Sequence, residues 1–183
     1  MSDICIIFAY LKCINMSKFK KNENYFNEIK TELQAYLLGF FLADGCIIEP
    51  KTGAKCIGMC LQESDKCVLE WFTQEISPQS KISQFRKKST GNIQYNIKFT
   101  APSLIKSLED LYLIKPKKTQ DLDFIFPFSK IPDDLIHHFV RGFFDGDGTI
   151  TVRKNGLVPQ FGFVAISKKF LEQLAIVLPF DDY

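Results

Sequence analysis

An α+β fold built from two related halves is predicted by three observations in this 183-residue sequence. First, two apolar segments end almost identically in Asp-Gly: YLLGFFLADGCI at residues 36–47 and HHFVRGFFDGDGTI at residues 137–150. Second, a similar series of short strands and a helix follows each segment, which predicts an internal duplication. Third, the composition is 46% hydrophobic and 24% charged, enough to bury one good core or two small ones.

Both repeated segments have the spacing of an amphipathic helix. Apolar side chains recur every three or four residues, at Leu33, Tyr36, Leu37, Phe40 and Phe41 in the first and at Leu135, Ile136, Phe139, Val140, Phe143 and Phe144 in the second. Gly45 and Gly148 follow these helices and are predicted to adopt positive φ. Small residues four positions apart, Gly39 with Ala43 and Gly142 with Gly146, predict that the two helices pack closely against each other.

The elements that follow set the expected domain organisation. The first half continues with strands, a helix, two more strands near 81–88 and 93–99, and a helix near 103–114, which gives the order α-β-β-α-β-β-α. The second half reaches Tyr183 after only α-β-β-α, so we expect this copy to be incomplete. The predicted divisions are an N-terminal extension (1–30), a complete first repeat (31–131) and a truncated second repeat (132–183).

Asp44 and Asp147 are the carboxylates on which a functional hypothesis rests. Each lies in the last turn of its helix, where the macrodipole disfavours an anion by some tenths of a kcal/mol. If the helices pack along their small residues, both carboxylates reach the same end. A divalent cation would relieve their repulsion, and Mg²⁺ or Mn²⁺ suits such oxygen ligands. The alternative for one segment alone is a core helix with a capping Asp-Gly turn, but two matched copies favour a site.

The charge distribution favours a nucleic-acid partner more than the formal net charge of +2 does. Residues 81–118 contain nine Lys or Arg against two acidic residues. The strand at 93–99 alternates apolar side chains with Gln94, Asn96 and Lys98; amides can read adenine edges and Lys can contact guanine or phosphate. An ordinary solvated sheet face is the alternative. The candidate DNA-binding residues are Lys81, Arg86, Lys87, Lys88, Gln94, Asn96, Lys98 and Arg153.

The segments LLGFFLADG (37–45) and VRGFFDGDG (140–148) resemble the two LAGLIDADG motifs of homing endonucleases, and the similarity extends from about residue 25 to 178. The resemblance implies that the two helices form the interface between pseudo-symmetric halves, each with an antiparallel DNA-binding sheet. It also implies that Asp44 and Asp147 bind the divalent ions at which both DNA strands are cut. The segment KPKKT resembles a family stretch with a catalytic lysine, which implies Lys118 with Lys117 as its neighbour. Simple helix capping or solvation by these lysines is the alternative.

These features predict a site-specific double-strand DNA endonuclease that hydrolyses phosphodiester bonds by two-metal chemistry. The alternative is a nucleic-acid-binding module without cleavage activity, such as an intron RNA maturase or a decayed endonuclease. The incomplete second copy favours self-association or a second chain that supplies the missing half.

The expected location is intracellular. The six cysteines read as reduced thiols, no signal sequence is recognised, and the apolar stretch near the start is too short to span a membrane. The bias toward Lys, Ile, Phe and Asn is typical of an A/T-rich genome, such as that of an organelle or a virus.

Overall fold

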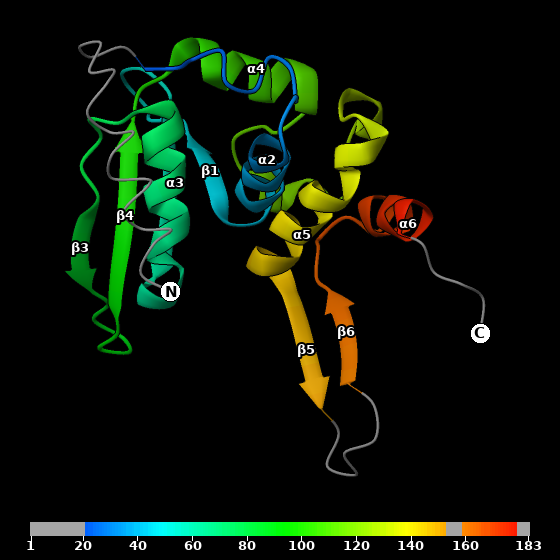
Figure 1. The fold of residues 1–183 in the computed structure, drawn as a ribbon. Coiled ribbons are helices and arrows are strands. Elements are labelled where there is room, and N and C mark those ends of the chain that lie inside the picture. The colour runs from blue at the N-terminus through cyan, green and yellow to red at the C-terminus, as the bar shows by residue number, and fades with distance from the viewer. Residues whose placement is uncertain (1–20, 153–158, 179–183) are drawn as a thin grey trace, which may run out of the picture.

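The computed structural model describes residues 21–152 and 159–178. Most of the expected N-terminal extension and the candidate DNA-binding residue Arg153 lie outside these ranges. Two helices, α2 (Glu32–Asp44) and α5 (Ile136–Asp147), lie at the centre, with one antiparallel sheet following each (Figure 1). The predicted α+β class with antiparallel sheets is therefore confirmed.

The first sheet has four strands and the second has two within the described residues. After α2 come β1 (Gly45–Ile48), β2 (Cys56–Gln62), α3 (Lys66–Ile76), β3 (Ser83–Arg86), β4 (Ile93–Phe99) and α4 (Pro102–Tyr112), with strands in the order β1-β2-β4-β3. After α5 come β5 (Gly148–Val152), β6 (Pro159–Phe163) and α6 (Lys168–Val177). Four short 3-10 segments connect these elements: η1 (Glu63–Asp65), η2 (Lys118–Gln120), η3 (Phe128–Lys130) and η4 (Asp133–Leu135).

The helices α2 and α5 approach each other backbone to backbone. A Cβ built on Gly39 would lie 2.0 Å from the carbonyl oxygen of Phe139, and one on Gly142 would lie 2.0 Å from that of Tyr36. A Cβ on Gly146 would lie 2.4 Å from the Cβ of Ala43. The missing side chains thus permit a contact that no other residue type allows, and the C-terminal ends of both helices reach the same end of the pair.

The predicted positive φ of Gly45 and Gly148 is wrong. Their φ values are −77° and −81° with extended ψ, because each helix passes directly into a strand instead of turning back. Glycine is still favoured by space: a Cβ on Gly45 would lie 2.1 Å from the ring of Phe41, and one on Gly148 would lie 2.3 Å from the carbonyl oxygen of Phe144.

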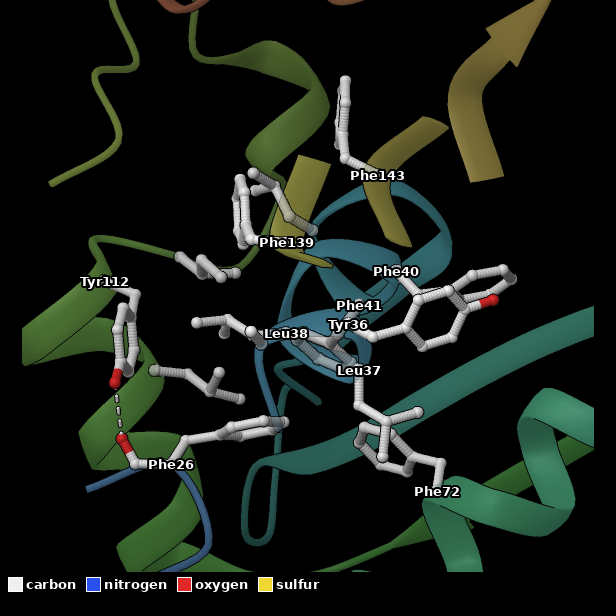
Figure 2. Packing of buried hydrophobic residues seen from close by; sticks show 14 of the residues in the cluster. Phe26, Tyr36, Leu37, Leu38, Phe40, Phe41, Phe72, Tyr112, Phe139 and Phe143 are labelled. Atoms are coloured by element: carbon white, nitrogen blue, oxygen red, sulfur yellow. Dashed lines mark hydrogen bonds between the residues drawn. The ribbon is translucent and has the colours of Figure 1, made fainter. Parts of the chain in front are cut away.

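One contiguous apolar core joins the two halves through α2 and α5. Figure 2 shows aromatic and leucine side chains radiating from these helices toward α3 on one side and α4 on another. Phe41 stacks on Phe72 with ring centroids 5.7 Å apart, and Phe139 packs on Phe126 at 4.4 Å. Each fully buried phenylalanine contributes roughly 1.5–3 kcal/mol. Among the described residues, no helix is both long and apolar enough to cross a bilayer.

Candidate functional site

Asp44 and Asp147 lie together at one end of the central helix pair. They are the last residues of α2 and α5. A Cβ built on Gly146 would lie 3.2 Å from Oδ2 of Asp44, so the Asp44 carboxylate lies against the end of α5. The two anions therefore share one region, at the negative ends of two helix dipoles.

Lys118 supplies the cation that this end of the pair requires. Its Nζ donates hydrogen bonds to the carbonyl oxygens of Phe41 (3.0 Å), Leu42 and Ala43 (2.8 Å). These carbonyls belong to the last turn of α2, where helical partners run out. The ammonium thus caps α2 from a distant part of the chain and lies beside both carboxylates.

The three charged groups perturb one another. Burial, with the Asp147 charge and despite Lys118, raises the pKa of Asp44 to about 6. Burial likewise raises the pKa of Asp147, and Lys118 opposes the change. Burial lowers the pKa of Lys118 to about 8, and both aspartates oppose that shift. Burial therefore disfavours the charged form of all three groups, and Lys118 offsets the repulsion between the two acids only in part.

The raised pKa of Asp44 predicts a pH-dependent stability in the absence of divalent cations. The folded state keeps a proton that the unfolded state releases near pH 3.8, so this stabilisation is present at low pH and is lost as pH rises through about 6. We expect Asp44→Asn to raise the free energy of unfolding at pH 7.5 by about 1 kcal/mol, a value reduced for solvent screening.

Urea denaturation in EDTA at pH 7.5 and pH 4.5 measures this difference. The gain should shrink at the lower pH, where Asp44 is itself mostly protonated. A variant that is no more stable than the wild type at pH 7.5 would show that the carboxylate is not strained.

The donor set fits a hard divalent cation. Two adjacent carboxylates are typical of sites in which Mg²⁺ keeps several waters and also binds phosphate oxygens. Among the described residues no group of three or more His, Cys, Asp or Glu could hold a metal ion, so these two acids would need such outside ligands. A cation would also offset the charge of Asp147 that, together with burial, raises the pKa of Asp44.

The two candidate lysines differ in position. Lys118 reaches the helix ends, whereas Lys117 is exposed and immediately precedes η2, with φ of +59°. Within the described ranges Lys117 makes no side-chain hydrogen bond or ion pair. The structure therefore brings Lys118, and not Lys117, to the carboxylates.

The amide and lysine side chains of β4 lie together on one face of the first sheet. Gln94, Asn96 and Lys98 are opposite Gln62, Cys60 and Gly58 of β2, and opposed residues share a face. The other face carries Ile97 and Phe99, which are buried in the core.

The basic residues around β3 are not all on that face. The strand ends at Arg86, so Lys87 and Lys88 lie in the turn that follows, and the expected strand over 81–88 is too long. Arg86 is opposite Ile93 and therefore lies on the other face, where its Nη1 donates to the carbonyl oxygen of Gly91 at 2.6 Å. Lys81 lies before β3 and is exposed.

Two cysteines near Asp44 were not identified from the sequence. Partial desolvation of the thiol by neighbouring atoms raises the pKa of Cys46 and of Cys60, while Lys118 opposes the change in the first and Lys87 in the second. Both side chains are exposed on the face that carries Asn96. Strand alternation after Asp44 is the signal that could have placed Cys46 there.

Residues 134–179 match the family model of the LAGLIDADG-like domain. This range runs from η4 through α6 and contains Asp147. The sequence resemblance to this family is thereby confirmed for the second half.

Two curated relatives are similar at low identity. Elongation factor 2 of Methanopyrus kandleri is 22% identical over 143 residues, which are 78% of this chain and 10% of that protein. A probable translation initiation factor IF-2 of Methanocaldococcus jannaschii is 24% identical over 144 residues, which are 78% of this chain and 11% of that protein. The chain thus spans about a tenth of the length of each.

Solved structures that are similar at low identity include a LAGLIDADG meganuclease and two homing endonucleases. Meganuclease I-AabMI bound to uncleaved DNA has a TM-score of 0.40 and 16% identity, over 72% of this chain and 64% of that chain. Homing endonuclease I-SmaMI bound to cleaved DNA has a TM-score of 0.43 and 15% identity, over 81% and 71%. I-WcaI bound to its recognition sequence has a TM-score of 0.40 and 12% identity, over 92% and 91%.

Proposed function

We propose, on the premise that residues 134–179 form a LAGLIDADG-like domain, that this protein is a site-specific double-strand DNA endonuclease. Its reaction is hydrolysis of phosphodiester bonds. The observation that supports this function most strongly is the meeting of Asp44, Asp147 and Lys118 at one end of two abutting helices. We assign the site to two repeats, residues 31–131 and 132–183. The proposal also includes an intracellular location, of organellar or viral origin.

The residues of the site would have two roles: the aspartates would hold cations, and the lysine would place a positive charge near the phosphate. Asp44 and Asp147 would hold Mg²⁺ or Mn²⁺, which when bound supplies Lewis-acid polarisation of the phosphate. Lys118 adds a fixed positive charge where negative charge develops in phosphoryl transfer. Its hydrogen bonds to the end of α2 hold it in place, so it needs no rearrangement during the reaction.

The first sheet would contact the DNA. Gln94, Asn96 and Lys98 face outward as a row that can meet base edges, while Lys81, Lys87 and Lys88 can contact phosphates. Phosphate contacts supply affinity that falls with salt, and base contacts supply sequence choice. Arg153 would extend the contact from the second half.

A nucleic-acid-binding module without cleavage activity is the second candidate, as in an intron RNA maturase. The observation that favours it is the second sheet, which has two strands among the described residues, whereas the first has four. A smaller second surface would lower the affinity for a long DNA duplex more than the affinity for a compact RNA.

A cleavage selection tests the proposal. The protein is incubated with Mg²⁺ and a plasmid library that carries randomised inserts, and linearised molecules are captured by linker ligation and sequenced. Recovery of one enriched sequence cut on both strands supports the endonuclease. Gel shifts with RNA and DNA run in parallel, and tight RNA binding with no cut product in Mg²⁺ or Mn²⁺ would favour the binding module instead.

Lys118→Met should reduce the cleavage rate at the selected site by at least about 100-fold, because it removes the charge nearest the carboxylates. The matched control is Lys117→Met, which changes an exposed neighbour and should retain most activity. Single-turnover rates at saturating protein separate this effect from weakened binding. Equal losses in the two variants would assign both lysines to general DNA attraction.

A further inference from the structure

The two flanks of the helix pair differ in what covers them. On one flank, the segment Asp123–Phe128, which runs from a turn to the first residue of η3, lies along α6 and is here called the strap. Gln173 of α6 holds it by accepting from the backbone N–H of Phe126 at 2.9 Å and donating to its carbonyl oxygen at 3.0 Å. Ser167 donates to the carbonyl oxygen of Phe124 at 2.7 Å.

The strap fills its flank with aromatic rings. Phe126 is fully buried, with its ring 4.4 Å from that of Phe139. Phe128 packs against Phe139 at 5.5 Å, and Phe124 packs against Phe170 at 5.6 Å. The flank between α5 and α6 is thus covered by a segment of the chain itself, held through its backbone and its aromatic rings.

The corresponding flank between α2 and α3 is only partly covered. The segment before α2 packs on α3, with the Asn22 backbone N–H donating to the carbonyl oxygen of Ile76 at 2.8 Å and the Phe26 ring 6.3 Å from that of Phe72, but it leaves the part beside Trp71 free. Tyr36 and Phe139 both lie eight residues before the terminal aspartate of their helix, and Trp71 and Gln173 both lie six residues after the N-cap of theirs. Where the strap lies on one side, the other side has a hollow of about 740 Å³ that no described residue fills. Trp71 lines it with 44% of its surface exposed, edge-on to Tyr36 at 6.2 Å.

The rim of this hollow is acidic and well ordered by internal contacts. Glu32, Glu75 and Asp145 line it against one cation, Arg141. Tyr36 donates its hydroxyl hydrogen to Oδ2 of Asp145 at 2.9 Å, and the Arg141 guanidinium lies 5.1 Å from the Tyr36 ring centroid. The guanidinium is therefore already engaged, and an incoming group would meet an excess of carboxylates.

We propose that this hollow binds an extended peptide segment of a partner protein, with an aromatic residue flanked by Lys or Arg. The aromatic side chain would pack on Trp71 as Phe126 packs on the opposite flank. The cationic neighbours would pair with Glu32, Glu75 and Asp145. The same carboxylates repel phosphate, so this surface is separate from the nucleic-acid interface and independent of the proposed cleavage.

Trp71 is the only tryptophan of the chain, so its fluorescence reports directly on the hollow. The probe is a fluorescein-labelled peptide, Lys-Phe-Ile-Phe-Pro-Phe-Lys, which copies the rings of the strap with cationic ends. We expect saturable binding by anisotropy, together with a shift of the Trp71 emission. The same peptide with Glu at both ends should bind at least tenfold more weakly, because its charges oppose the rim.

Substitutions in and outside the hollow test whether the peptide binds there. Trp71→Ala should weaken the anisotropy response to the Lys-flanked peptide at least tenfold, and Glu75→Gln should reduce the preference for Lys over Glu ends. The matched control is Phe85→Ala, which removes another half-exposed aromatic residue, on β3. Circular dichroism checks that each variant is folded. Unchanged binding in Trp71→Ala, equal affinity for both peptides, or displacement of the peptide by duplex DNA would overturn the proposal.

Discussion

Asp44→Asn and Asp147→Asn should each reduce DNA cleavage by at least about 1,000-fold while leaving DNA affinity within a few-fold of the wild type. The reason is that each substitution keeps the shape of the side chain but removes one of the two charges that would hold the cations. The proposed DNA-binding face of β4 should be unaffected, since neither aspartate lies on that strand. Cleavage is measured as the single-turnover rate on the selected target, and affinity is measured by gel shift in Ca²⁺.

The control for this pair is Asp133→Asn, which removes an exposed carboxylate in η4. It should cut at the wild-type rate. If either site variant retained full cleavage, the carboxylate concerned would have no part in the reaction, and the proposed metal-holding role would have to be abandoned.

Gly142→Ala should produce the largest loss of stability, roughly 3 kcal/mol. Its Cβ would lie 2.0 Å from the backbone oxygen of Tyr36, which cannot rotate away as a side chain could. The helices must therefore separate, and the core between them loses contact. The greater helix propensity of Ala, about 1 kcal/mol, offsets only part of this cost.

Thermal and urea unfolding measure this loss, with Gly162→Ala as the matched control. A Cβ on Gly162 meets only Cγ2 of Thr149, at 3.3 Å, so that change should be nearly neutral. The double variant Gly39→Ala with Gly142→Ala should lose less than the sum of the single losses, since one separation of the helices relieves both clashes. Strict additivity would contradict the idea that both glycines serve one contact.

The central helix pair could be predicted from the sequence because the patterns that indicate it are local and occur twice. The spacing of Tyr36, Phe40 and Phe41 predicts a helix with a buried face, and an element of the same pattern ends at Asp147. Both helices and the antiparallel strands after them are where these patterns predict. The strand over 93–99 could be predicted equally well, since alternation of apolar and polar residues with a period of two is typical of a strand with one buried face.

Other features depend on tertiary contacts that no local pattern encodes. Which of two adjacent lysines reaches the end of α2 is decided by the backbone at η2, where Lys117 adopts positive φ and Lys118 follows it. Arg86 falls on the core side of the sheet because of strand register. The hollow beside Trp71 can be found only from the three-dimensional placement of α2, α3 and α5.

The most direct test of the account is the paramagnetic effect of Mn²⁺ on amide NMR signals in the absence of DNA. If Asp44 and Asp147 share a cation site, substoichiometric Mn²⁺ should broaden the signals of Gly45 and Gly148 together, and excess Mg²⁺ should restore both. Asp44→Asn should weaken the broadening at both glycines, including the one in the other half. Broadening at one glycine alone, or at neither, would contradict a site shared by the two helix ends.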